Sequence, residues 1–454
     1  MTYKQVIRII HKFIPRFIRE QFINDAVAQY SEIKRLNREA ILSAEKTITE
    51  EVDKKEVDKK EVDKKEVDKK EFVLVSSIEE LGCGYELLFK SIDRTCKMSG
   101  ATLVIDSKEY KKDDINTVLP DVFVYMLSNV SVVGRTNLII NSNKFYSFDL
   151  NEMHSYHEIK RPDIIKKVDT DIFAIDFKKS DNNNLLPDKV FVHLLDDYSF
   201  NYYHFMVEVL PRFIKILDVL KQQSDYNLND YVFLVDKRVS EQNISALRAI
   251  AGNDVNVCMV TENQEFFCHK LVYCKPVSVL LENHSNPPNI QKDIVIDEEA
   301  LLEVRNRIFN AIDIKLFKTF NTRKVYLQRI SDFRKITNIN ELELLMHKRG
   351  FEFVNTAGLS LEEQISLFQH AEYVVGPSGA SFTNIIFMRP GTNVINLCPS
   401  VSTVNYNVFQ ALASSVDVNL VYFLTKPIDN TVFLHSPSAV DLNAFEKYLD
   451  QLGI

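Results

Sequence analysis

Paired cysteine motifs are absent from this chain of 454 residues, although it contains six cysteines. No two of them have the C-x-x-C spacing of a zinc knuckle, so the sequence offers no structural zinc site of that kind. Scattered cysteines of this kind indicate reduced thiols and therefore a cytosolic compartment. They are Cys83, Cys96, Cys258, Cys268, Cys274 and Cys398.

Long apolar runs and basic stripes are missing as well. No stretch reaches the roughly 18 apolar residues of a membrane-spanning helix, and no signal peptide is recognisable. The net charge of −8 argues against nucleic acid as the main partner. A hydrophobic content of 45% with 30 phenylalanines is ample for buried cores. A chain of this length predicts two or more domains.

The first 23 residues have an amphipathic pattern. Apolar residues recur at helical spacing and cations lie mainly on the other side, as in a helix that binds an anionic membrane surface. Docking on the body of the protein itself would produce the same pattern. We predict an amphipathic helical N-terminus over residues 1–46 and a peripheral position on the cytoplasmic side of the membrane. The apolar positions are Val6, Ile10, Phe13, Ile14, Phe17 and Ile18.

Residues 51–70 repeat the sequence EVDKK four times. Five residues advance a helix by about 500°, so the valines rotate around it and cannot form a buried seam. Each glutamate meets lysines three and four positions later, which supports a solvated single helix. We predict a charged helical spacer over residues 47–71, about 30 Å long, with a disordered segment as the alternative.

From Phe72 onward, apolar runs that suit buried strands alternate with helical patterns. The strand candidates are TLVIDS (102–107), VFVHLL (190–195), YVFLVD (231–236) and KLVYC (270–274), and helical patterns cover 201–220 and 240–250. After a linker at 283–293, the same alternation resumes through KVYLQR, FEFVN, YVVG and NVINL. This order predicts an α/β fold with parallel sheets and two Rossmann-like domains, 72–290 and 291–436, followed by a closing helix over 437–454.

The sequence GPSGASFTN (376–384) interrupts two apolar runs with glycines, a proline and hydroxyls. Small residues leave the backbone accessible, and a helix N-terminus at the end of a strand favours an anion. Arg329 also follows a strand, and Arg334 and Lys335 stand on the same loop. Several cations beside one helix N-terminus predict a diphosphate site. The remaining predicted contacts are Glu363, which we also expect to form a capping box with Ser360, and Ser378, Gly379, Ala380, Ser381, Thr383 and Asn384.

The motifs, in their order, resemble glycosyltransferase family 61. The resemblance rests on NYYHFMVEVLPRF, VYLQRISDFRKITN, GFEFVNTAGLSLEEQISLFQHA and VVGPSGASFTNIIFMRPGTNVINLCP, and it covers roughly Phe191 to Tyr422. The family's usual histidine in the turn is Ser378 here, the following glycine is Ser381, and the acidic residue after the last strand is Asn396. Ser378 can still donate a hydrogen bond to a phosphate.

The resemblance implies a GT-B fold with a central cleft and an inverting, metal-independent transfer from a nucleotide sugar. Residues 72–290 would bind a glycan or lipid-linked glycan acceptor and residues 291–436 the donor, in the synthesis of a capsule or lipopolysaccharide. The D-x-D at Asp169 and Asp171 precedes an apolar run, so we expect no metal there and no other cofactor. Alternatives are a non-catalytic scaffold of the same fold in a polysaccharide assembly complex and a phosphotransferase of teichoic type.

The catalytic base should come from the N-terminal half. His204 and Glu208 are four residues apart on a predicted helix, so both face the same side, and Pro211 should kink the helix just beyond them. We predict His204 as the base and Glu208 as its partner. Glu208 alone is the nearest alternative, and pairing of Glu208 with Arg212 would leave a structural histidine. Asn201 and Arg212 complete the predicted cleft.

Overall fold

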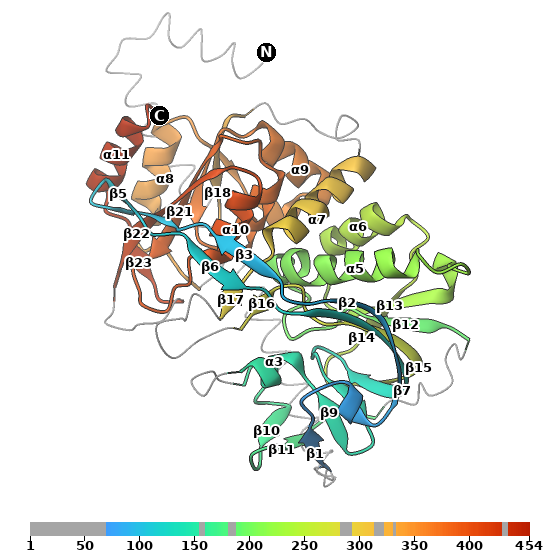
Figure 1. The fold of residues 1–454 in the computed structure, drawn as a ribbon. Coiled ribbons are helices and arrows are strands. Elements are labelled where there is room, and N and C mark those ends of the chain that lie inside the picture. The colour runs from blue at the N-terminus through green and yellow to red at the C-terminus, as the bar shows by residue number, and fades with distance from the viewer. Residues whose placement is uncertain are drawn as a thin grey trace, which may run out of the picture. The chain divides into compact units, whose positions relative to one another are not determined.

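The computed structural model describes residues 70–153, 159–179, 188–281, 293–312, 322–329, 333–428 and 435–454 (Figure 1). All of them belong to one compact unit, residues 69–454. The predicted N-terminus (1–46), its membrane-binding residues 1–23 and the spacer (47–71, apart from its last two residues) lie outside the described residues. So does nearly all of the predicted linker at 283–293. Within the described ranges, no helix combines the length and the apolar composition needed to cross a bilayer.

The first sheet has eleven strands and a parallel part made of four neighbours, β14-β13-β12-β15. β15 pairs antiparallel with β7, and β7 pairs antiparallel with β2. Beyond β7 the sheet continues with strands from the N-terminal part of the described chain. The strands are β1 (Lys70–Leu74), β2 (Gly84–Ser91), β7 (Val122–Val133), β8 (Ile139–Asn141), β9 (Lys144–Tyr146), β10 (Ile165–Lys167), β11 (Ile172–Ile175), β12 (Val190–His193), β13 (Tyr231–Asp236), β14 (Val257–Val260) and β15 (Glu265–Cys274).

The second sheet has eight strands, and its first six neighbours, β19-β18-β20-β21-β22-β4, are parallel. Two small two-stranded sheets, β3 with β6 and β16 with β17, lie outside it. The strands of the second sheet are β4 (Thr102–Ile105), β5 (Lys108–Lys111), β18 (Lys324–Leu327), β19 (Glu352–Val354), β20 (Tyr373–Pro377), β21 (Asn393–Pro399), β22 (Asn419–Pro427) and β23 (Ser438–Ala439). Those of the small sheets are β3 (Thr95–Met98), β6 (Ile115–Val118), β16 (Val279–Leu280) and β17 (Ile294–Val295).

Several helices begin at a polar residue whose side chain accepts a hydrogen bond from the first turn. Ser240, Asp297, Ser360 and Asp441 do so for α6, α7, α9 and α11. The helices are α3 (Phe148–Glu152), α4 (Tyr202–His204), α5 (Leu210–Leu220), α6 (Glu241–Ala251), α7 (Glu298–Ala311), α8 (Ile339–Lys348), α9 (Leu361–His370), α10 (Asn407–Ser415) and α11 (Leu442–Gln451), with short 3₁₀ turns at Glu79–Leu81, Leu228–Asp230 and Thr356–Gly358.

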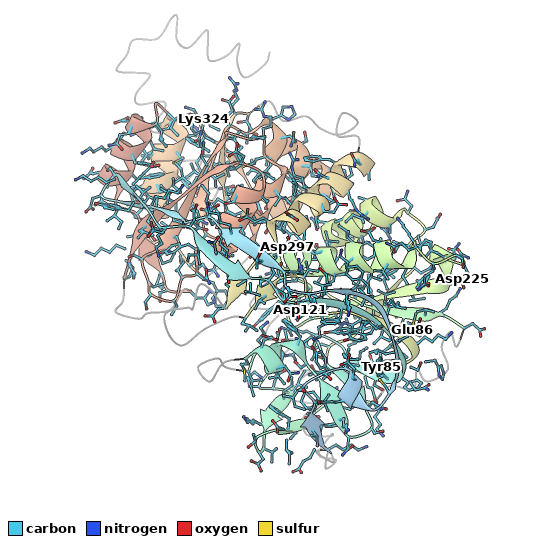
Figure 2. The ribbon with its side chains drawn as sticks, in the orientation of Figure 1. Tyr85, Glu86, Asp121, Asp225, Asp297 and Lys324 are labelled. Atoms are coloured by element: carbon cyan, nitrogen blue, oxygen red, sulfur yellow. The ribbon has the colours of Figure 1, made fainter. Side chains whose placement is uncertain are left out.

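One large apolar cluster joins helices that follow strands of both sheets. It includes Phe213 of α5, Leu301 of α7, Phe368 of α9 and Phe409 of α10, all buried. Asp297, labelled in Figure 2, caps α7 and also forms an ion pair with Arg94, which donates to the carbonyls of Pro120 and Val277 as well. Apolar burial and this half-buried cation therefore connect α7 to the strands of the first sheet.

The helix after β12 contains a widened turn. Between α4 and α5 the backbone is π-helical over Phe205–Val209, and the N–H of Leu210 bonds to the carbonyl of Phe205, five residues back. Pro211 follows directly and has no N–H to donate to a carbonyl four residues earlier. The helix therefore changes its hydrogen bonding at the position where the sequence predicts a kink. Turns of this kind are frequent at functional sites.

The α/β class predicted from the sequence is confirmed. Every quoted strand candidate forms a strand, and the helical patterns at 201–220 and 240–250 are helical. The strand predicted at 102–107 is β4, which pairs with β22 in the second sheet although the sequence analysis places it in the domain 72–290. The helix predicted in the run after Gly379 is a 3₁₀ helix, Ala380–Phe387, labelled η6 hereafter. The domain boundaries themselves stay predictions.

A buried histidine ends β12 and makes stability depend on pH. His193 is fully buried, neither ring nitrogen has a hydrogen-bond partner among the described residues, and burial followed by the charge of Arg212 lowers its pKa to about 3. The unfolded chain takes up a proton below its ordinary pKa of about 6.5, whereas the folded chain does not. His193 therefore lowers the free energy of unfolding as the pH falls through about 6.5.

We expect His193→Leu, which is apolar and of similar size, to remove this pH dependence. Between pH 7 and pH 5.5 the unmodified protein should lose about 1.3 kcal/mol more unfolding free energy than the variant. Urea unfolding at the two pH values measures the difference. Equal losses in the two proteins would mean that His193 is protonated as readily in the folded state as in the unfolded one.

Candidate functional site

The second sheet has a strand order that reverses at one point, and ligands of such sheets bind there. Its five consecutive strands β18 to β22 lie in the spatial order 2-1-3-4-5, so the order reverses between β18 and β20. Ligands of such sheets bind beyond the carboxyl ends of the strands at this point. Arg329 follows β18 and the turn that begins at Ser378 follows β20. The fold thus brings these two predicted elements to the same place.

Two arginines meet one carbonyl in this turn. Nη1 of Arg329 donates to the carbonyl of Ser378 at 2.9 Å, and Nη1 of Arg334 lies 3.5 Å from the same oxygen. Nε of Arg329 donates to the carbonyl of Phe333 at 3.1 Å, and within the described residues Nη2 makes no hydrogen bond. Burial and then the charge of Arg334 lower the pKa of Arg329 to about 10. An anion placed here would relieve the repulsion between the two cations.

Position 379 has no room for a side chain because the Arg329 guanidinium lies against it. A Cβ atom at this position would lie 2.0 Å from Nη1 of Arg329, and its φ of 179° is ordinary extended backbone. Gly376 is equally close to β18, because a Cβ there would lie 2.9 Å from the carbonyl oxygen of Leu327. The two glycines therefore serve close approach, one of a guanidinium and one of a neighbouring strand.

The residues of the turn after Gly379 contact other side chains of the protein. Ala380 begins η6, and the hydroxyl of Ser381 lies 2.8 Å from that of Thr356. Thr383 and Asn384 are fully buried. Asn384 donates to Oε1 of Gln364 at 2.7 Å and accepts from the Tyr202 hydroxyl at 2.8 Å. In this arrangement Ser378 and Gly379 are buried, Ala380 and Ser381 are half-buried, and Asn384 ties the turn to α4.

Two predicted donor residues have other contacts. Lys335 is exposed, and its carbonyl accepts from the N–H of Ser438. The Glu363 carboxylate accepts from the N–H of Ser360 at 3.0 Å, while the Ser360 hydroxyl accepts from the N–H of Glu363 at 3.2 Å. The predicted capping box is confirmed. The structure therefore brings Arg329, Arg334 and the turn together and engages Glu363 at the start of α9.

His204 and Glu208 form a close pair. Nδ1 of His204 lies 2.6 Å from Oε2 of Glu208, and both side chains are about nine-tenths buried. The ring of Tyr198 stacks on the His204 imidazole with a centroid distance of 5.2 Å. A hydrogen bond from Nδ1 to the carboxylate places the ring's lone pair on Nε2. This geometry can hold an imidazole base in one orientation.

The other two predicted cleft residues position this helix. Asn201 caps α4 by accepting from the N–H of Tyr203 at 2.9 Å. Arg212, which is fully buried, donates from Nε to the backbone carbonyl of Glu208 at 3.2 Å and from Nη2 to Oδ2 of Asp196 at 3.1 Å. The acidic partner of Arg212 is thus Asp196, and the carboxylate of Glu208 faces His204.

A buried acidic cluster lies beside this pair. The carboxylates of Asp149, Asp196 and Asp197 approach within 4.8 Å of one another, and Nζ of Lys160 donates to Oδ2 of Asp149 at 2.7 Å. Burial raises the pKa of Asp149 to about 6 and that of Asp197 well above its ordinary value. Burial would also raise the pKa of Asp196, but Arg212 and Lys160 lower it. Among the described residues, these three carboxylates are the group that could hold a metal ion.

Sequence reasoning missed this cluster. Asp196 and Asp197 follow β12 at the point where the parallel strand order β14-β13-β12-β15 reverses. The rule that ligands gather beyond strand ends could have identified them. Asp149 and Lys160 come from the segment around α3, and only the folded chain shows that they lie nearby. Asp169 and Asp171 lie in the turn between β10 and β11.

A comparison with protein families matches this same part of the chain. Residues 202–395 match the family model described as Glycosyltransferase 61. The match begins at Tyr202, includes the His204–Glu208 pair and Arg329, and continues past the turn into β21. No curated protein matches the chain. The predicted resemblance to glycosyltransferase family 61 is therefore confirmed over residues 202–395, and that family implies glycosyltransferase activity.

Proposed function

We propose that this chain is an inverting glycosyltransferase that moves a sugar from a nucleotide-sugar donor to a glycan acceptor. The observation that carries the proposal is the convergence of Arg329 and Arg334 on the carbonyl of Ser378, at the reversal point of a parallel sheet. Two cations at such a point suit the diphosphate of a nucleotide sugar. The two sets of parallel strands support a GT-B arrangement.

The donor diphosphate would lie against the backbone at Ser378 and Gly379. Nε and Nη1 of Arg329 donate to backbone carbonyls. Nη2, which makes no hydrogen bond within the described residues, would donate to the diphosphate. As the bond between the sugar carbon and the phosphate oxygen breaks, negative charge grows on the nucleotide, and the two guanidinium groups stabilise it. The arginines thus supply positive charge without a metal ion.

The acceptor hydroxyl would be activated by His204. Its oxygen attacks the sugar carbon from the face opposite the leaving phosphate, and Nε2 of His204 takes the proton. Glu208, 2.6 Å from Nδ1, orients the ring and stabilises the imidazolium that forms. One C–O bond forms, one breaks, and the nucleotide leaves as the anion.

The acceptor and the location extend this proposal. We infer a surface polysaccharide such as a capsule or lipopolysaccharide, on a lipid-linked or growing chain, as the acceptor on the cytoplasmic side of the membrane. The basic and apolar faces predicted for residues 1–23 support it, since they suit an anionic membrane surface. A panel of nucleotide sugars, with released nucleotide and transferred sugar as readouts, tests the activity and identifies the donor. Release of no nucleotide in the presence of glycan acceptors would favour a scaffold.

His204→Ala should lower kcat by a factor of about 10² or more, the usual scale for a lost general base. Nucleotide affinity should stay unchanged because the arginines are untouched. His347→Ala, in the last turn of α8, is the matched control and should keep full activity. A near-normal kcat in His204→Ala together with a large loss in Glu208→Gln would assign the base to Glu208.

Gly379→Ala should displace the Arg329 guanidinium and weaken nucleotide binding at least about tenfold, the scale of a lost hydrogen bond to a charged group. The fold should persist, since the colliding atom is the end of a flexible side chain. Gly358→Ala meets no atom within 4 Å and serves as the control. Equal nucleotide affinity in both variants, measured by calorimetry, would contradict the donor site.

Activity should persist in excess EDTA, because the arginines carry the charge that a divalent ion would otherwise carry. The measurement is the initial rate of nucleotide release with and without the chelator. A complete loss restored by manganese would refute the metal-free mechanism. It would direct attention to Asp149, Asp196 and Asp197, and to Asp169 and Asp171.

A further inference from the structure

A small pocket with both polar and apolar side chains in its wall opens beside the acidic cluster. It has a volume of about 30 Å³, and the side chains around it include Asn137, Asp149, Lys160, Arg161 and Asp197. A space of this size holds about two water-sized groups. It is therefore too small for a whole sugar ring but large enough for the hydroxyl groups on one edge of it.

One side chain of the pocket, Asp197, has a buried oxygen without a partner in the described part of the chain. Asp197 is 6% exposed, and within the described residues its Oδ1 makes no hydrogen bond. Neighbouring charges are engaged, since Lys160 pairs with Asp149 and Arg161 with Asp163 and Glu262. A buried oxygen left unpaired costs free energy, so a hydroxyl that donates to it would be bound favourably.

The pocket is also connected to the predicted base through neighbouring residues. Asp197 directly precedes Tyr198, whose ring stacks on His204. Arg212 connects the neighbouring Asp196 to the backbone of Glu208. The donor turn reaches the first turn of the same helix through the bond between Tyr202 and Asn384. The His204–Glu208 pair is thus connected through its own segment to the donor turn and to this pocket.

We propose that the pocket formed by Asn137, Asp149, Lys160 and Asp197 binds hydroxyl groups of the acceptor sugar. A hydroxyl both donates and accepts, so it can donate to Oδ1 of Asp197 while it accepts from the Lys160 ammonium. An inverting transfer needs the base and the acceptor hydroxyl on the face of the sugar carbon opposite the leaving nucleotide, and the contacts of Tyr198 and Arg212 connect the pocket to that base. The inference rests on the proposed transfer and names its acceptor site.

Binding of a panel of methyl glycosides, followed by ligand-observed NMR titration, tests the pocket without any turnover. Asp197→Ala should weaken the binding of those glycosides that the unmodified protein binds by at least about tenfold, the scale of a lost hydrogen bond to a charged group. Asp197→Glu, which keeps the carboxyl group but fills the pocket, should do the same. The control is Asp230→Ala, at an exposed carboxylate in the 3₁₀ turn directly before β13. It should leave glycoside binding unchanged.

The integrity of each variant is checked by its affinity for UDP, CDP and GDP, which should equal that of the unmodified protein. Glycoside binding that survives both Asp197 substitutions overturns the proposal, as does the absence of glycoside binding by the unmodified protein. Loss of nucleotide affinity together with glycoside affinity also overturns it, because Asp197 would then be a structural residue. Glycoside binding that depends on Asp197 in a protein without transferase activity would uphold the pocket and reject the proposed function.

Discussion

The arrangement of the candidate site depends on the buried guanidinium of Arg212. It binds the carboxylate of Asp196 at the end of β12 and the backbone carbonyl of Glu208 in the π-helical turn. A buried charge is stable only when it is paired and its hydrogen bonds are satisfied. Arg212 therefore fixes the helix that carries His204 and Glu208 to the end of the strand. Its charge also helps to lower the pKa of His193 and of Asp196.

The two sheets place opposite charges at their reversal points. Arg329 and Arg334 lie at that point in the second sheet, whereas Asp196 and Asp197 follow the strand at the reversal point of the first. A cationic site suits a leaving diphosphate, and an acidic one suits hydroxyl groups that donate hydrogen bonds. The division of charge between the sheets thus parallels the division between donor and acceptor in the proposed reaction.

The sequence was informative where interactions are local. Apolar runs identified the strands, the four-residue spacing placed His204 beside Glu208, and Ser360 with Glu363 gave the capping box. It could not place β4, which pairs with β22 more than 300 residues later in the chain. For the same reason it missed Asp149 and Lys160, whose position beside Asp197 follows from tertiary packing.

The prediction named every polar residue of the turn as a possible donor contact, although these side chains differ in how deeply they are buried. Pattern reasoning cannot tell a side chain that faces a ligand from one that faces the interior. Ser378, Thr383 and Asn384 are all buried, whereas Ser381 is half-buried.

Asn384, a predicted donor contact, forms hydrogen bonds with two side chains of the protein. Its amide nitrogen donates to Gln364, and its oxygen accepts from the Tyr202 hydroxyl. An amide can satisfy both partners at once because it carries a donor and an acceptor, whereas a carboxylate of the same shape could only accept. The turn that approaches the arginines is thereby joined to the first turn of the helix that carries His204. Because Tyr202 and His204 are two residues apart, this amide holds the turn next to the segment that carries the predicted base.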